Sequence, residues 1–113
     1  MTVQELVETL PLRVVTGHAH LDKKVSGGYA SDLLSNVMGR AVAGNVWVTM
    51  QGHQNIVAVA SLAGLAAVIV AGDVEPDKDA VRRAASEEVV LITTTLPTFE
   101  VVGRLYSLGI TGA

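Results

Sequence analysis

The chain has 113 residues and a net charge of −3; half of its residues are hydrophobic and only 4% are aromatic. This length fits one domain over residues 1–113, and the shortage of aromatic side chains favours strands covered by helices. The scattered basic residues exclude a nucleic-acid partner, and the absence of cysteine excludes disulfides, thiolate nucleophiles and Cys-ligated metals.

The first predicted helix begins with a capping box, in which Thr2 and Glu5 have the spacing that lets each bond the other's backbone. Pro11 ends this helix, and residues 12–16 are predicted to form the first strand, which Gly17 closes. The apolar residues between positions 18 and 26 show neither helical nor strand periodicity. The glycine pair that follows, Gly27 and Gly28, is typical of a turn or an exposed loop.

A second helix is predicted to begin at Ser31, which can cap it, with Asp32 in its first turn. Its expected buried stripe is Leu33, Leu34, Val37, Met38 and Ala41. The second strand covers residues 46–50, and Trp47 is expected in the core. The helix over residues 54–62 is apolar nearly all round, so either a second copy or a deeply buried position in one chain would explain it.

Residues 66–71 are predicted to form the third strand, and a polar helix begins at Pro76–Asp77. The fourth strand covers residues 89–93. One face of the last helix carries Phe99, Val102, Gly103 and Tyr106. This alternation predicts a three-layer α/β/α fold with a mostly parallel sheet of about four strands and helices on both faces.

Four segments resemble the DRTGG domain family: GGYASDLLSNVM (27–38), NVWVTMQGHQNIVAVASL (45–62), AAVIVAG (66–72) and FEVVGRLYSLGI (99–110). The pentapeptide that names the family is absent, so its role is not carried over. The resemblance implies a fold similar to the N-terminal domains of HPr kinase/phosphorylase and MurF. It also implies a non-catalytic regulatory domain that forms subunit contacts, as a homodimer or with a protein partner.

A kinase activity is not expected, because the chain has no G-x-x-x-x-G-K-[ST] loop to hold a phosphate. In open α/β sheets, ligands bind beyond the carboxyl ends of the strands. Glycine turns and helix starts at those ends suit a small anionic ligand, such as an adenine nucleotide. The candidate binding residues are Gly17, His18, Gly52, His53, Asn55, Gly72 and Thr94.

Two other interpretations of these residues stay open. The glycines can simply make tight turns, while His53 and Asn55 cap a helix. Alternatively, His18 and His20 have the H-x-H spacing of metal ligands, and His53 could complete a three-nitrogen site in a small metal-dependent enzyme. No resident metal or cofactor is expected.

The first residues do not resemble a signal peptide, because they carry charges early and no long apolar run. The most apolar segment, residues 56–72, falls short of the ~20 residues needed to cross a bilayer. We therefore expect a cytoplasmic protein with no membrane partner.

Overall fold

The computed structural model describes residues 1–112, in which five strands form one sheet. The strand order is β1-β5-β4-β3-β2; β2 to β5 run parallel, and β1 pairs antiparallel with β5. The predicted α/β class is confirmed, with one strand more than expected. The strands are β1 (Arg13–Thr16), β2 (Gly27–Ala30), β3 (Asn45–Thr49), β4 (Ala67–Val70) and β5 (Leu91–Thr93).

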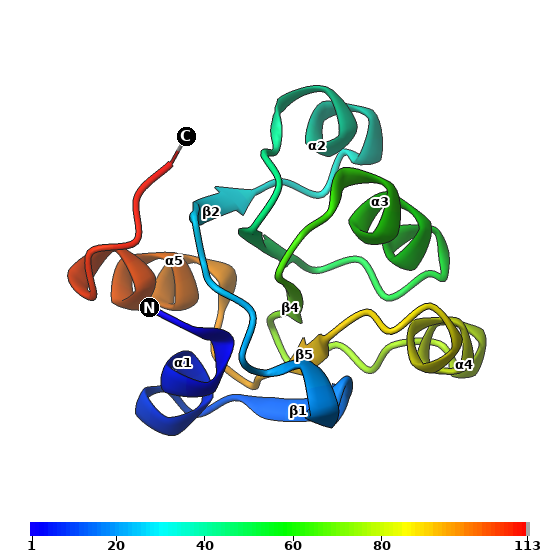
Figure 1. The fold of residues 1–113 in the computed structure, drawn as a ribbon, viewed down its shortest axis with the longest axis horizontal. Helices are drawn as coiled ribbons and strands as arrows, with labels where there is room; N and C mark the ends of the chain where they lie inside the picture. Colours follow the sequence, from blue (N-terminus) through cyan, green and yellow to red (C-terminus); the bar gives the residue numbers. More distant parts are fainter. Residues whose placement is uncertain (113) are drawn as a thin grey trace.

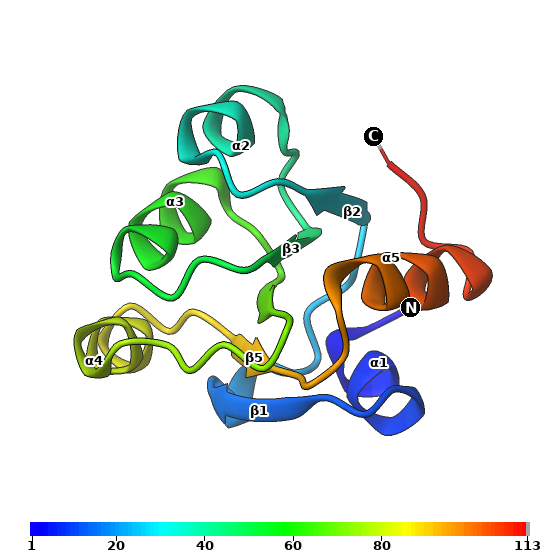
Figure 2. The ribbon, with the colours of Figure 1, turned by 180° about the vertical axis from the view of Figure 1, so that it is seen from behind.

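Helices cover both faces of the sheet, as Figures 1 and 2 show. On one face lie α1 (Val3–Thr9) and α5 (Thr98–Ser107); on the other lie α2 (Leu34–Arg40), α3 (Asn55–Ala63) and α4 (Lys78–Ser86). A short 3-10 helix, η1 (His18–His20), follows β1. None of the helices within residues 1–112 has the length and apolar character needed to cross a membrane.

Two interior strands of the sheet, β3 and β4, are buried along their whole length. Their side chains alternate between two apolar clusters, so Val46 and Val48 pack toward α1 and α5 while Trp47 packs toward α3. Trp47 is fully buried, as predicted, and its indole N–H donates a hydrogen bond of 2.8 Å to the carbonyl oxygen of Ser31.

The predicted capping box at the start of α1 is confirmed. The Thr2 hydroxyl accepts from the Glu5 amide at 3.3 Å, and the Thr2 amide donates to the Glu5 carboxylate at 3.2 Å. The helix then buries Val3 and Leu6 in the cluster that it shares with α5.

The prediction of a turn at Gly27 and Gly28 is wrong, because both residues belong to the edge strand β2. A Cβ atom on Gly27 would lie 2.8 Å from the carbonyl oxygen of Thr111 and 3.3 Å from the side-chain amide of Asn45. The glycine therefore serves close packing between chain segments, which is a reason that its neighbours in the sequence do not reveal.

The predicted start of the second helix is also wrong. The helix begins at Leu34, and the Ser31 hydroxyl accepts from the Leu33 amide just before it. The Asp32 carboxylate instead accepts from the Thr49 hydroxyl at 2.8 Å and from the Met50 amide at 2.7 Å. Asp32 thus ties the end of β2 to the end of β3. In the predicted buried stripe, Val37 is fully buried but Leu33 and Met38 are exposed.

The apolar helix α3 is covered within the single chain, since it packs between α2 and α4 over the sheet. Its buried side chains are Ile56, Val57, Val59 and Ala60. Of the two explanations for its composition, the structure therefore favours a buried helix over an interface with a second copy.

The positions of two α3 side chains predict opposite effects of the same substitution. Val59 is 8% exposed and Leu62 is 77% exposed. Val59→Asp places an unpaired charge in the core and should lower the free energy of unfolding by about 3 kcal/mol or more. Leu62→Asp should cost less than about 1 kcal/mol. Urea denaturation checks both values, and a stable Val59→Asp monomer would contradict this packing.

Candidate functional site

The antiparallel direction of β1 divides the predicted binding residues between two opposite edges of the sheet. Because β3, β4 and β5 run parallel, the residues that follow them meet at one edge. The residues after β1 lie at the other edge, so the structure separates them from this group. Gly52, His53, Asn55, Gly72 and Thr94 lie at the first edge, and Gly17 and His18 lie at the second.

The two glycines at the first edge are packed against the chain itself. A Cβ atom on Gly52 would lie 3.1 Å from the carbonyl oxygen of Glu75, and the Gly52 carbonyl accepts from the Asp77 amide at 2.8 Å. Gly72 has a φ of +77°, and a Cβ atom there would lie 3.0 Å from the terminal methyl of Met50. Tight turns and close packing thus account for both glycines.

His53 and Asn55 lie at the start of α3, and the histidine caps the helix. The His53 Nδ1 accepts from the Asn55 amide at 3.1 Å, and the His53 carbonyl accepts from the Ile56 amide at 3.1 Å. Both His53 and Asn55 are exposed, and the first turn of α3 contains no acidic residue. The positive end of the helix dipole is therefore not neutralised by a carboxylate of its own helix.

Thr94 is buried and has a structural role at the end of β5. Its hydroxyl donates to the carbonyl oxygen of Pro11 at 2.9 Å and accepts from the Leu96 amide at 3.2 Å. A hollow of about 240 Å³ beside it is lined by Arg13, Asp73 and Glu75, among others. Two carboxylates and one guanidinium make this hollow a poor site for an anion.

The predicted three-histidine metal site is not assembled. His18 and His20 lie in η1 beside a hollow of about 420 Å³, where the His20 Nε2 is 3.9 Å from the Glu88 carboxylate. His53 lies at the opposite edge of the sheet. Among residues 1–112, no three His, Asp or Glu side chains are grouped to hold a metal ion.

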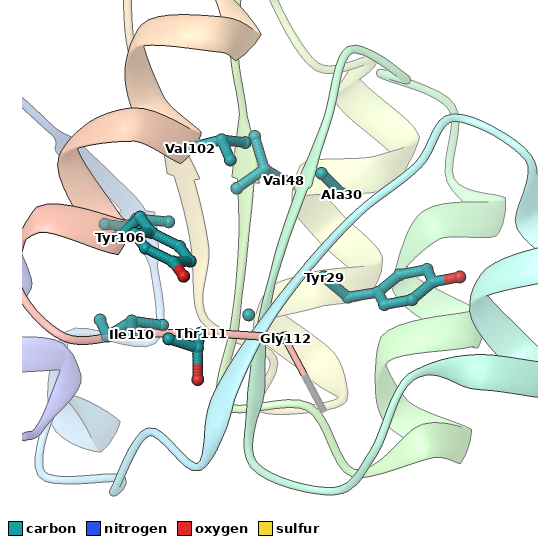
Figure 3. Close-up of a pocket in the computed structure, with 10 residues that line it drawn as sticks. Tyr29, Ala30, Val48, Val102, Tyr106, Ile110, Thr111 and Gly112 are labelled. Carbon is teal, nitrogen blue, oxygen red and sulfur yellow. The ribbon is translucent and has the colours of Figure 1, made fainter.

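A feature that sequence reasoning did not identify as a site is an apolar groove of about 260 Å³ between α5 and the edge strand β2. Figure 3 shows that Val102 and Tyr106 reach it from α5, and Ile110 from the segment that follows. Tyr29 lines the groove with its backbone and not with its ring. The ring points away from the groove, and its hydroxyl donates to the Asn36 Oδ1 at 2.6 Å.

Beside the groove, α5 has two apolar faces, one buried against the sheet and one exposed. Val101 and Leu105 are buried against the sheet, whereas Phe99 is 88% exposed and Tyr106 is 66% exposed. The prediction that Phe99 and Tyr106 share one helix face is correct, but that face points away from the core. The signal in the sequence is that apolar residues occupy two neighbouring faces of one helix, of which the sheet can cover only one.

Comparisons with known proteins place the chain as follows. The family model for the DRTGG domain matches residues 5–108. A search of curated proteins finds no match. Among solved structures, the chain is similar to the CBS and DRTGG domains of the regulatory region of Clostridium perfringens pyrophosphatase, complexed with its activator diadenosine tetraphosphate. The TM-score is 0.75 at 15% identity, and the match covers 97% of this chain but 47% of the other, about half its length.

The hydrogen bonds of Thr94 lead to a test of its structural role. Thr94→Val leaves the Pro11 carbonyl and the Leu96 amide without their partner, and should lower the free energy of unfolding by about 1–3 kcal/mol. Thr95→Val, at the exposed neighbour, should change it by less than about 0.5 kcal/mol. Thermal unfolding of both variants measures the difference. Equal free energies of unfolding would show that the hydrogen bonds of the Thr94 hydroxyl do not stabilise the fold.

Proposed function

Because this chain belongs to the DRTGG domain family, we propose that it is a non-catalytic regulatory and assembly domain, which acts by binding and not by catalysing a reaction. The observation that carries the proposal is the exposed apolar stripe of α5 beside the apolar groove. Contiguous exposed apolar surface marks a site of association. The same feature supports a homodimer, or a complex with another protein chain.

The ligand that we propose is a small anion such as an adenine nucleotide, bound at the start of α3. The first turn of α3 has no acidic residue, and the exposed His53 and Asn55 flank it. The similar pyrophosphatase regulatory region is complexed with an adenine dinucleotide, diadenosine tetraphosphate. Gly52 and Gly72 contribute by shaping this edge of the sheet, and Gly17 and His18, which lie at the opposite edge, are not part of the proposed site.

The competing function, a metal-dependent enzyme that uses His18, His20 and His53, loses its geometric basis because the third histidine lies at the other edge. The similarity to the N-terminal domain of HPr kinase/phosphorylase stays a prediction. We propose a cytoplasmic location, which the absence of cysteine suits, since thiol-free chains are compatible with a reducing compartment.

A thermal-shift titration with ATP, diadenosine tetraphosphate and inorganic phosphate tests the ligand. At a hundredfold excess over the dissociation constant, a bound ligand stabilises the folded chain by about 2.7 kcal/mol, which is a saturable rise of several degrees in the melting temperature. A flat response to all three compounds would contradict ligand binding and leave assembly as the function.

The location of the ligand is tested by the substitution Asn55→Asp, which adds a carboxylate to the first turn of α3. It should weaken binding about fivefold, because it competes with the anion for the positive end of the helix. The matched control is Gln4→Glu, which adds the same charge to the first turn of α1 on the other face of the sheet. Equal affinities for both variants would contradict a site at α3.

A further inference from the structure

The helix α5 carries a stripe of four residues that the chain leaves uncovered. Phe99, Val102, Gly103 and Tyr106 are spaced i, i+3, i+4 and i+7, and all four side-chain positions are exposed. We call these four residues the α5 stripe. Its spacing is that of a face that packs against another helix, although Val101 and Leu105 already anchor α5 on the sheet.

Gly103 lies in the middle of the α5 stripe, where glycine weakens a helix relative to alanine. A Cβ atom on Gly103 would meet nothing within 4 Å, so packing inside the chain does not require a glycine there. A bare backbone at the centre of an apolar stripe permits the close approach of another helix.

We propose that a second copy of this chain packs its own α5 antiparallel against the α5 stripe. This inference rests on the self-association proposed above and names its surface. In a two-fold dimer, a residue i that contacts residue j is repeated as j contacting i. An axis near residues 102–103 places Phe99 of each copy beside Tyr106 of the other, and Val102 beside Gly103 where the helices cross.

The groove beside the stripe supplies the receiving surface for this arrangement. Tyr106 and Val102 belong to both the α5 stripe and the groove wall, as Figure 3 shows. Phe99 of the second copy, placed beside Tyr106, therefore reaches the groove. No residue that lines the groove carries a charge, so an aromatic ring enters it without leaving an unpaired ion. One face thus holds both a projecting side chain and the hollow that accepts it.

The charges at the rim of the stripe are complementary under the same two-fold axis. Within α5, the Arg104 Nε lies 3.4 Å from the Glu100 Oε2. The antiparallel arrangement brings Glu100 of each copy within about one residue of the level of Arg104 of the other, so two pairs of opposite charges meet along one flank of the stripe. A parallel arrangement would bring like charges level with each other.

The amount of aromatic surface fits a second copy. A fully buried Phe or Tyr contributes roughly 150–250 Å², so Phe99 and the exposed part of Tyr106 supply at most about half of the ~800 Å² that each partner buries in an interface of standard size. Val102 and the groove walls add to this area. The stripe and groove together thus provide a contact that suits a small dimer.

Light scattering on the full chain over a range of concentrations tests the proposal. The wild type should show twice the mass of one chain, and Gly103→Gln should raise the dimer dissociation constant at least tenfold because the side chain keeps the helices apart. The same substitution should not lower the melting temperature of the monomer, since glutamine favours the helix more than glycine does. Gly39→Gln is the matched control, because Gly39 lies in α2 with open space around its Cβ position.

A second pair of variants tests the aromatic contact. Phe99→Ser should also raise the dissociation constant at least tenfold, whereas Leu62→Ser, an equally exposed type of position on α3, should leave it unchanged. A wild type that stays monomeric would overturn both this surface and the proposed self-association. A dimer that survives both Gly103→Gln and Phe99→Ser would overturn only the surface and leave self-association intact.

Discussion

The burial of β3 and β4 on both faces is the constraint on which the rest of this structure depends. Every residue of these strands is excluded from water, so each strand needs an apolar layer above and below it. The chain meets this need with two clusters, one under α1 and α5 and one under α2, α3 and α4. Trp47 and Val48, adjacent in the sequence, belong to different clusters for this reason.

The direction of β1 determines what the edges of the sheet can do. Because β1 is antiparallel to β5, its closing glycine and the histidines of η1 lie away from the ends of the parallel strands. At the edge where those ends do meet, Thr94 and Gly52 are engaged in hydrogen bonds and close contacts within the chain. His18 and His20 therefore do not meet the residues at the ends of the parallel strands.

The helix α5 has two apolar faces, of which one packs on the sheet and the other is exposed. Val101 and Leu105 anchor it to the sheet, while Phe99 and Tyr106 face outward beside the groove. By contrast, α3 is the more apolar helix, yet α2 and α4 cover it. Overall hydrophobicity thus left open whether α3 is covered by its own chain or by a second copy, because cover by neighbouring elements, and not composition, decides which apolar face remains exposed.

The sequence by itself determined the features whose signals are local. The capping box at Thr2, the buried strand around Trp47 and the alternation of strands and helices each follow from spacing within a few residues, and the family resemblance follows from segments of this kind. About the candidate site, the sequence identified the capping role of His53 as one of its alternatives.

Only the tertiary structure decided which residues meet. Gly27 lies in a strand because β2 pairs with β3, and Asn45 and Thr111 pass close beside it. Asp32 binds the end of β3, whereas the first turn of a helix was expected for it. The direction of β1 and the outward face of α5 were decided in the same way. Strand direction, register and cover depend on contacts between segments far apart in the chain, and the spacing of neighbouring residues carries no record of those contacts.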